Sequence, residues 1–271
     1  MTLVLTEVSN AGVAMVADSA ISFYDKQGNL GVRNREEWKK LLWVGKVAAG
    51  VSYWGSIGEI TRRRFDEWLD EAIRVGDFHD LPSLAAYLAG VLNTAAKNQP
   101  VQRPMGVHVA GFHDWEDHVR RPMFFHVHNG DGQIAWAQAV DANGNISLHP
   151  TYQWGPRTLF APHRDLPTVG APVDLEVARL GSGWITSNGD FTTYSVIAGK
   201  LMETCAILRA IPNVHVPRDP TKIGSKVAVL NLILQTVISI HKLSSLSKGI
   251  GGKISVLGIG PNGKYVGSKL N

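Results

Sequence analysis

The hydrophobic pattern of the first nineteen residues predicts a β-hairpin. Thr2 to Val8 is apolar and β-branched, with a polar residue at every second or third position. Ser9 to Gly12 has turn composition, because Asn and Gly tolerate the positive φ that a tight turn needs. Val13 to Ala17 is a continuous apolar run, as expected of a strand covered on both faces, and it ends abruptly at Asp18 and Ser19.

The rest of the chain predicts a mixed order of strands and helices. Each element is inferred from alternation, from helical apolar stripes or from turn residues. Early in the chain we expect strands or loops at 19–33 and two strands at 36–51 around Gly45-Lys46. A helix opened by a capping box at Ser56–Glu59 follows, and then a second helix from Asp80 or Ser83 to just before Pro100. Beyond these we expect strands within 105–149 that include 134–140, helices at 191–210 and 223–243, and strands at 253–259 and 265–266.

A proline-rich stretch interrupts this order. Five prolines fall between Pro150 and Pro172, with no sustained periodicity. We therefore expect one domain spanning 1–271 that carries an irregular insertion at about 150–180. Such a loop is either a subunit contact or a cover over a site, and the sequence does not choose between them.

Composition narrows the protein class. Hydrophobic residues are 44% and charged residues 18%, as in a globular protein with a sizeable core. No apolar run reaches the roughly 18–20 residues of a membrane span, and no signal peptide is evident. The lone Cys205 excludes an intramolecular disulfide and fits a cytoplasmic protein. The net charge of +4 is scattered, apart from Arg62–Arg64 and Arg120-Arg121, so we expect neither nucleic acid nor membrane as a partner.

Thr2 is the first candidate for chemistry. It is small enough that an aminopeptidase is expected to remove Met1, which would place a free α-amine and a hydroxyl on the same residue. An α-amine titrates at about 7.7–8.0, so a good fraction is neutral at cellular pH. It can then act as the base for its own hydroxyl.

Thr2, the strand after it, the Gly12 turn and Val16–Ser19 resemble the amino-terminal signature of proteasome β-type subunits. These are N-terminal-nucleophile (Ntn) hydrolases, and the group includes the bacterial relatives HslV and Anbu. The sixteen-residue separation of Thr2 and Asp18 is also that group's spacing. The resemblance implies an α+β, four-layer αββα sandwich and a threonine-type peptidase or amidohydrolase that acts through an acyl-enzyme. It further implies a homo-oligomeric ring or helical stack, a peptide or unfolded-protein substrate and room for an ATPase partner, without any cofactor.

The resemblance also assigns a lysine to the site. In the group a lysine at the start of the next strand lies beside the threonine hydroxyl and pairs with the aspartate, which lowers the hydroxyl's pKa. Lys40, followed by Leu41, is the match. Side chains alternate across a strand, so Lys39 and Lys40 cannot both face the site, and we choose Lys40. The alternative is two solvated lysines on an edge strand.

Two further site residues come from the resemblance. Gly50 is the candidate whose N–H would hold the oxyanion, although a glycine needed for tight packing would look the same. Ser187, in a turn before a helix, is the candidate partner of the threonine amine. Asp190 and Ser182 are the alternatives, and Asn188-Gly189-Asp190 can equally be a helix N-cap.

The carboxyl-terminal part departs from the group's pattern. If Gly251-Gly252 is the glycine pair that follows an aspartate and a serine in the group, this chain has Ser247 and Ile250 in their places. Ser244, Ser245 or Ser247 could act from a shifted loop, or the amine is less well tuned. A catalytically silent subunit with an assembly or binding role is therefore the alternative to an active hydrolase.

Several histidines fall in the predicted strands of 105–149. His126 and His128 would share a strand face, which invites a metal interpretation. No cysteine partner and no closely spaced carboxylate accompany them, so we expect histidines satisfied within the sheet and no metal.

Overall fold

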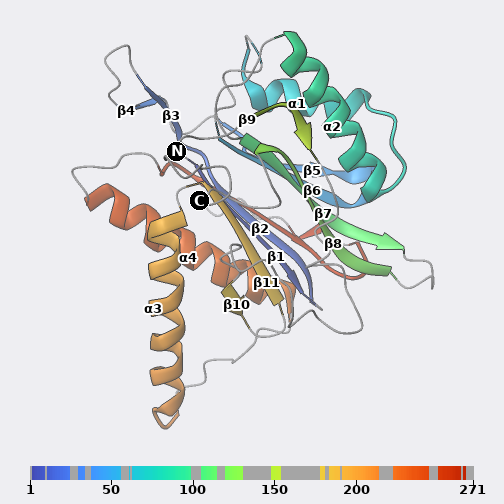
Figure 1. Cartoon of the computed structure of the whole chain (residues 1–271). Coiled ribbons are helices and arrows are strands. Elements are labelled where there is room, and N and C mark those ends of the chain that lie inside the picture. The colour runs from blue at the N-terminus through green and yellow to red at the C-terminus, as the bar shows by residue number, and fades with distance from the viewer. Residues whose placement is uncertain are drawn as a thin grey trace.

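The computed structural model shows an α+β chain with two main antiparallel sheets and four α-helices among the residues it describes (Figure 1). The α+β class expected from the sequence is thereby confirmed. The described residues are 2–9, 11–24, 30–33, 38–55, 61, 63–98, 105–114, 120–130, 148–153, 178–180, 183–189, 191–213, 222–243, 250–263 and 265–266.

The first sheet is built around the amino-terminal hairpin. Strands β1 (Leu3–Ser9) and β2 (Gly12–Asp18) pair antiparallel, as predicted. Gly12 is required at the turn, because its φ is +126° and an added Cβ would lie 2.1 Å from the Ile259 carbonyl oxygen. The sheet order is β10-β11-β1-β2-β12-β13, with β10 at Ala178–Leu180, β11 at Gly183–Gly189, β12 at Ile254–Ile259 and β13 at Tyr265–Val266.

The second sheet follows in the order β5-β6-β7-β8-β9. Its strands are β5 (Leu41–Val44), β6 (Ala49–Gly55), β7 (Met105–Asp114), β8 (Arg120–Gly130) and β9 (Leu148–Gln153). A 3₁₀ helix at Gly45–Val47 makes the turn predicted at Gly45-Lys46. A separate pair, β3 (Ile21–Tyr24) and β4 (Leu30–Arg33), matches the strands expected within 19–33.

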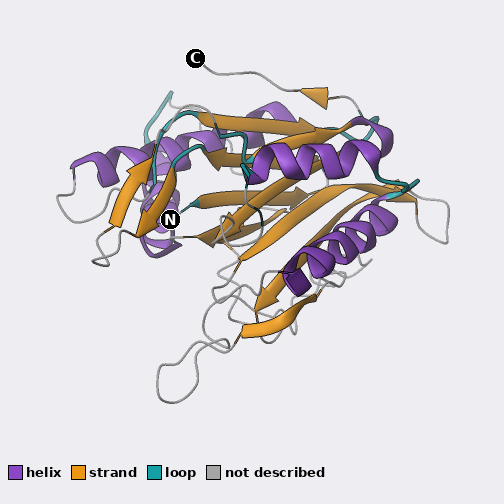
Figure 2. Cartoon of the chain, turned by 90° about the horizontal axis from the view of Figure 1, so that it is seen from above, coloured by secondary structure: helices purple, strands orange, loops and turns teal. Residues whose placement is uncertain are grey.

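Helices cover both sheets, and each buries an apolar stripe. Helices α1 (Phe65–Val75) and α2 (Leu81–Asn98) share a buried cluster with β5–β8. Helices α3 (Phe191–Ala210) and α4 (Ile223–Leu243) share another with β1, β2 and β12. A third cluster joins Val8, Val13 and Met15 to Ala110 and Phe124 of the other sheet. The two helix pairs lie on opposite sides of the strands in Figure 1, and Figure 2 views the same strands from above.

Three sequence predictions need correction or fall outside the described residues. Helix α1, Phe65–Val75, covers the later part of the first expected helix, and the capping box at Ser56–Glu59 lies outside the described residues. The stretch expected to be irregular from Pro150 begins inside β9, because residues 148–153 pair with β8. The strand expected at 134–140 and the rest of the proline-rich stretch, 154–177, lie outside the described residues.

Among the described helices, α4 is long and apolar enough to cross a membrane by length and composition. It packs against β2 and β12. Lys226 and His241 are buried on its inner side, at 1% and 4% exposure, and Lys226 Nζ lies 2.7 Å from Glu7 Oε1 of β1. This is the pattern of a core helix that carries a buried ion pair.

Candidate active site

The hairpin register brings Thr2 to Asp18. Val4 lies opposite Ala17, so the start of β1 meets the end of β2. The Leu3 N–H donates to Asp18 Oδ1 at 2.9 Å, which fixes the carboxylate beside the residue that follows the threonine. Thr2 is 5% exposed and Asp18 is 1% exposed. The predicted pair of threonine and buried aspartate is therefore brought together by backbone pairing.

Lys40 completes a connected polar cluster. Its Nζ donates to Thr2 Oγ1 at 2.9 Å, to Asp18 Oδ1 at 2.9 Å and to the Ala20 carbonyl oxygen. A lysine ammonium has three donors and no acceptor, so three acceptors satisfy it completely. Lys40 lies directly before β5 and is 0% exposed. In this geometry Lys40 donates to the threonine hydroxyl oxygen, which leaves the hydroxyl proton free to move elsewhere.

Asp18 is an acceptor for four donors. Its Oδ1 accepts from the Leu3 N–H and from Lys40 Nζ. Its Oδ2 accepts the Ala20 N–H at 3.2 Å and the Gly251 N–H at 3.1 Å. An ionised carboxylate accepts at both oxygens, whereas a protonated one would turn one of them into a donor. The carboxylate is therefore the ionic anchor of the cluster.

Burial and charge act in opposite directions on Lys40. Burial lowers the pKa of Lys40, and the neighbouring Asp18 carboxylate raises it again. The result is a pKa below the usual 10.5 of a lysine, since burial outweighs the ion pair. A lysine with a lowered pKa gives up a proton more readily than a solvated one, so it can respond to charge that develops on the threonine oxygen.

Lys39 and Lys40 face opposite ways, as strand alternation predicts. Lys39 is exposed, whereas Lys40 is buried against Thr2 and Asp18. The backbone N–H of Lys39 donates to Asp66 Oδ2 at 3.0 Å. The choice of Lys40 over Lys39 therefore agrees with the side chain that the structure places beside the threonine.

Gly50 is placed differently from the oxyanion donor that the resemblance implied. The Tyr53 N–H donates to the Lys40 carbonyl oxygen, so this N–H points toward β5. Successive N–H groups of a strand point to opposite edges, which directs the Gly50 N–H toward β7 and away from Lys40. An added Cβ at Gly50 would lie 2.4 Å from Met15 Sδ and 2.5 Å from Leu257 Cδ2. The structure thus supports the packing alternative for this glycine.

The same alternation points to a glycine that the sequence reasoning missed. Gly55, the last residue of β6, lies opposite Met105 and has a φ of +91°. Gly55 lies two residues beyond Tyr53, so its N–H points to the same edge of β6 as the Tyr53 N–H, which is the edge that faces Lys40. The signal available in the sequence was the pairing register, because a hairpin centred on residues 45–48 places residues 53–55 beside Lys40.

Ser187 lies inside a strand and not in a turn. It is part of β11, opposite Leu5 of β1, and 9% exposed. The register places Gly189 opposite Leu3, so Gly189 and not Ser187 is the described β11 residue paired nearest to Thr2. The alternatives Asp190 and Ser182 lie outside the described residues.

The carboxyl-terminal segment reaches the site through its backbone. Gly251 donates its N–H to Asp18 and accepts the N–H groups of Ser19 and Ala20 at 3.2 and 2.9 Å. Ile250 is 3% exposed and belongs to the cluster under α3 and α4. If Gly251-Gly252 is the glycine pair of the resemblance, a hydrophobic core residue stands in place of the serine, and Ser244, Ser245 and Ser247 lie outside the described residues.

Comparison with known proteins found no matching family model and no matching curated protein. Two similar solved structures are Anbu proteins. One is a Gly-1 mutant from Hyphomicrobium sp. strain MC1, with 10% identity, a TM-score of 0.47, and coverage of 98% of this chain and 85% of that chain. The other, an ancestral β-subunit from Yersinia bercovieri, has 10% identity, a TM-score of 0.46, and coverage of 94% and 80%. Both neighbours are distant, and neither says anything about the activity of this chain.

The predicted sheet histidines form a buried polar group between the sheets. His108 Nδ1 lies 2.9 Å from Thr6 Oγ1, and Trp54 Nε1 donates to His126 Nε2 at 3.0 Å. The two imidazole rings meet edge to face at 5.2 Å. Within the described residues, no group of three or more His, Cys, Asp or Glu side chains could hold a metal ion.

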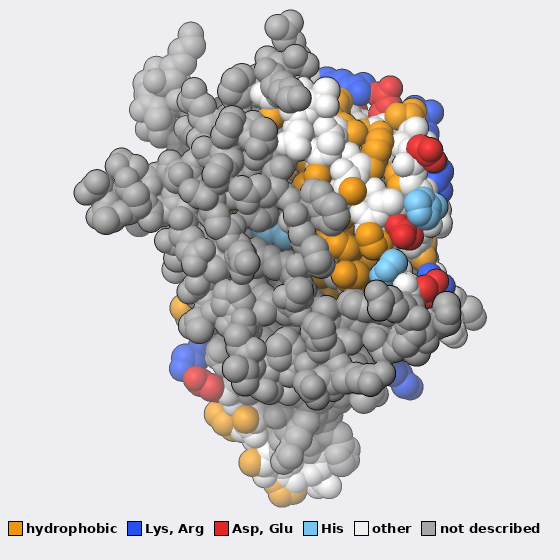
Figure 3. Space-filling view, turned by 45° about the vertical axis from the view of Figure 1, so that its right-hand side comes forward, with side chains coloured by type: hydrophobic (Ala, Val, Ile, Leu, Met, Phe, Trp, Pro, Cys, Tyr) orange, Lys and Arg blue, Asp and Glu red, His pale blue; other side chains and the backbone are white. Residues whose placement is uncertain are grey.

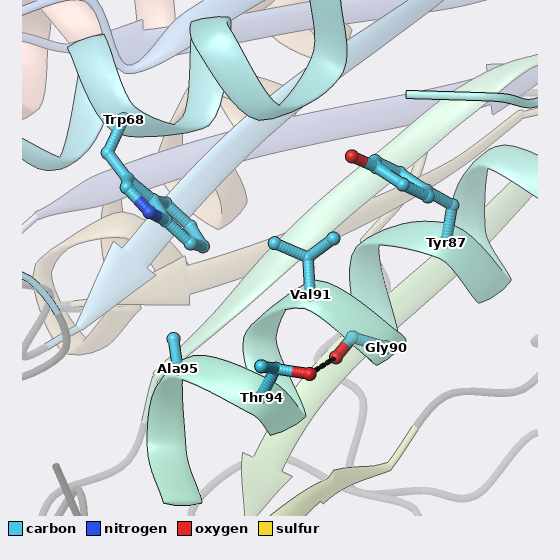
Figure 4. Close-up of a pocket in the computed structure, with 6 residues that line it drawn as sticks. All are labelled: Trp68, Tyr87, Gly90, Val91, Thr94 and Ala95. Atoms are coloured by element: carbon cyan, nitrogen blue, oxygen red, sulfur yellow. Dashed lines mark hydrogen bonds between the residues drawn. The ribbon is translucent and has the colours of Figure 1, made fainter. Parts of the chain in front are cut away.

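A cavity of about 600 Å³ lies between α1 and α2, apart from the threonine (Figure 4). Its lining residues are Trp68, Tyr87, Gly90, Val91, Thr94 and Ala95. On this side of the molecule hydrophobic side chains lie beside charged ones (Figure 3). None of Thr2, Asp18 or Lys40 lines the cavity, so it does not belong to the cluster described above.

Proposed function

We propose that this protein is an N-terminal threonine hydrolase that cleaves peptide or amide bonds through an acyl-enzyme. The observation that carries the proposal is the buried cluster in which Lys40 Nζ contacts both Thr2 Oγ1 and Asp18 Oδ1 at 2.9 Å. A fully buried lysine is costly, and its placement against a hydroxyl and a carboxylate is characteristic of functional sites.

The reaction begins after removal of Met1. The neutral α-amine of Thr2 takes the hydroxyl proton while Oγ1 forms a bond to the carbonyl carbon of the substrate. The carbon–nitrogen bond then breaks, and the amine product leaves with the proton held by the α-amine. A water molecule adds to the resulting ester with the same amine as base. The ester bond breaks, the acid product leaves, and Thr2 regains its hydroxyl proton.

Each neighbouring residue has one role. Lys40 donates to Oγ1 and stabilises negative charge on it, because a cation beside an oxygen lowers its pKa. Asp18 keeps Lys40 charged and holds it in place. The oxyanion needs a backbone N–H aimed at the developing charge, and Gly55 replaces Gly50 as our candidate for that donor.

The wider assignments form part of the same proposal. We propose a single domain over 1–271 with the four-layer αββα arrangement, present in the cytoplasm as a homo-oligomeric ring or helical stack. An unfolded peptide is the substrate form that reaches a site enclosed by such an assembly, and an ATPase partner would supply it.

A catalytically silent subunit is the second candidate, and one observation favours it. Ile250 is packed in the core where the group has a serine that polarises the threonine amine. An isoleucine side chain neither donates nor accepts a hydrogen bond. The cluster of Thr2, Asp18 and Lys40 would then be a structural remnant in a protein kept for assembly.

Intact-mass measurement and a β-lactone probe separate the two candidates. An active enzyme should lack Met1 and gain the mass of the probe on Thr2, and Thr2→Ala should abolish that gain. Thr2→Ser keeps a hydroxyl and should still be labelled, which provides the matched control. Retention of Met1 in all molecules, or equal labelling of the Thr2→Ala variant, would contradict the hydrolase and favour the silent subunit.

A further inference from the structure

Lys40 lies outside the regular pairing of the second sheet. Strand β5 begins at Leu41, and residues 38–40 have no regular secondary structure. On the β6 side, the Lys40 carbonyl oxygen accepts the Tyr53 N–H at 3.3 Å, a long hydrogen bond. Something else must therefore hold the backbone that aims this buried side chain at Thr2.

Asp66 of α1 provides that second attachment. Its Oδ2 accepts the backbone N–H of Lys39 at 3.0 Å, on the peptide unit directly before Lys40. Its side chain is 2% exposed, although aspartate is rarely buried without a partner. The attachment fixes the backbone of Lys39, whose side chain is exposed, directly before Lys40, whose side chain is buried.

Arg64 holds the Asp66 carboxylate in turn. Arg64 Nε donates to Oδ1 at 3.1 Å and Nη2 to Oδ2 at 2.6 Å, a two-point contact that fixes the plane of the carboxylate. The Arg64 guanidinium also lies 4.9 Å from the centre of the Trp38 ring, two residues before Lys40. The start of α1 therefore grips residues 38 and 39 from one side.

We propose that Asp66 is a positioning residue for the reaction at Thr2, because it fixes the backbone that aims Lys40 at the threonine hydroxyl. This inference rests on the proposed function for its kinetic consequence, and its structural consequence is independent of it. A displacement of about 1 Å at a reacting group can lower a rate about 100-fold, so loss of the attachment is costly to catalysis. Asp66 acts through Lys40 and touches neither Thr2 nor Asp18.

Asp80 provides a matched control for the purely structural role of such a carboxylate. It lies before α2, and its Oδ1 accepts the Ser83 N–H at 2.8 Å, as a capping residue does. Like Asp66, it has a pKa held below the usual 3.8 despite some burial. Its hydrogen-bonding partner Ser83 belongs to α2 itself, so Asp80→Ala should weaken a helix start and leave Lys40 in place.

The kinetic test measures acylation of Thr2 by a β-lactone probe. Asp66→Ala should lower the rate constant at saturating probe by about 10- to 100-fold and leave the half-saturating concentration nearly unchanged. Asp66→Asn keeps an oxygen acceptor for the Lys39 N–H and should recover most of the rate, and Asp80→Ala should retain the wild-type rate. Equal rates for wild type and Asp66→Ala, or equal losses for Asp66→Ala and Asp66→Asn, would overturn the proposal.

A second test does not depend on activity. Reductive methylation followed by fragment mass spectrometry reports each lysine, and exposed Lys39 is the internal reference. Wild type and Asp80→Ala should be methylated at Lys39 and protected at Lys40, while Asp66→Ala should gain a label at Lys40. Continued protection of Lys40 in Asp66→Ala would overturn the inference. The two proposals can fail separately. If the β-lactone does not label the wild type but Asp66→Ala still gains a methyl label at Lys40, the proposed function is contradicted and the positioning role of Asp66 is not.

Discussion

Loss of the Lys40 ammonium should destabilise the protein measurably, because its partner is a buried carboxylate. Lys40→Met keeps the length of the side chain and removes the charge. Asp18 would then retain three backbone donors, the N–H groups of Leu3, Ala20 and Gly251. Breaking a buried ion pair by removing one partner costs about 3–5 kcal/mol. Since three donors still stabilise the carboxylate, we expect the lower end, about 3 kcal/mol.

The opposite change leaves a buried cation and should cost more. In Asp18→Asn, one amide oxygen can replace only one of the two carboxylate oxygens, so Lys40 loses the negative charge beside it and the amide NH2 meets backbone N–H donors. We expect about 4–5 kcal/mol for this variant. The double variant removes both charges together, so its loss should fall short of the sum by about 2 kcal/mol or more.

Thermal unfolding at neutral pH, supported by urea titration, measures all three variants. For a chain of this length 1 kcal/mol corresponds to about 2–4 °C in Tm, so Lys40→Met should lower Tm by about 6–12 °C. Lys39→Met, the same change at an exposed neighbour, should alter the stability by less than about 0.5 kcal/mol. The losses of unfolding free energy in the two single variants would add in the double variant if the residues acted independently. A coupling below about 0.5 kcal/mol would therefore refute the description of Lys40 and Asp18 as a coupled pair.

Two further predictions concern neighbouring positions. Gly50→Ala should lose about 1–3 kcal/mol in urea unfolding, because the added Cβ overlaps the ends of the Met15 and Leu257 side chains, and wild-type stability would show that both move aside freely. Burial raises the pKa of Asp66, but hydrogen bonds from Arg64 and the Lys39 N–H outweigh it and bring it below 3.8. The stabilisation of the folded protein by ionised Asp66 is therefore present above pH 3.8 and is lost as the pH falls through the lowered pKa. The Tm difference between wild type and Asp66→Asn should shrink in that pH range. A difference that grew there would contradict this reasoning.

The resemblance pointed to Thr2, Asp18 and Lys40, and the structure brings these three side chains together. The hairpin register explains why Thr2 and Asp18 meet, and alternation explains why only one of Lys39 and Lys40 can face them. Gly50 and Ser187 show where such reasoning stops. Choosing a candidate oxyanion glycine requires knowing whether each N–H of β6 points toward β5 or toward β7. The turn at 45–48 indicates the pairing with β5, but the sequence does not show which strand lies on the other side.

One element placed wrongly has a physical reason as well. Pro150 suggested an irregular segment, but it lies in β9, the last strand in the order of the second sheet, where a missing N–H is tolerated. Pairing with β8 decided what the local composition left open.

The hydrogen bond from Gly251 to Asp18 joins residues 233 positions apart. During synthesis the threonine, the aspartate and the lysine all leave the ribosome long before Gly251 and β12, which pairs with β2 from Ile254 onward. The Asp18 carboxylate therefore lacks one of its four donors, and β2 lacks one of its two neighbouring strands, until almost the whole chain has emerged. The hydrogen bonds around Thr2, Asp18 and Lys40 can therefore be completed only near the end of translation.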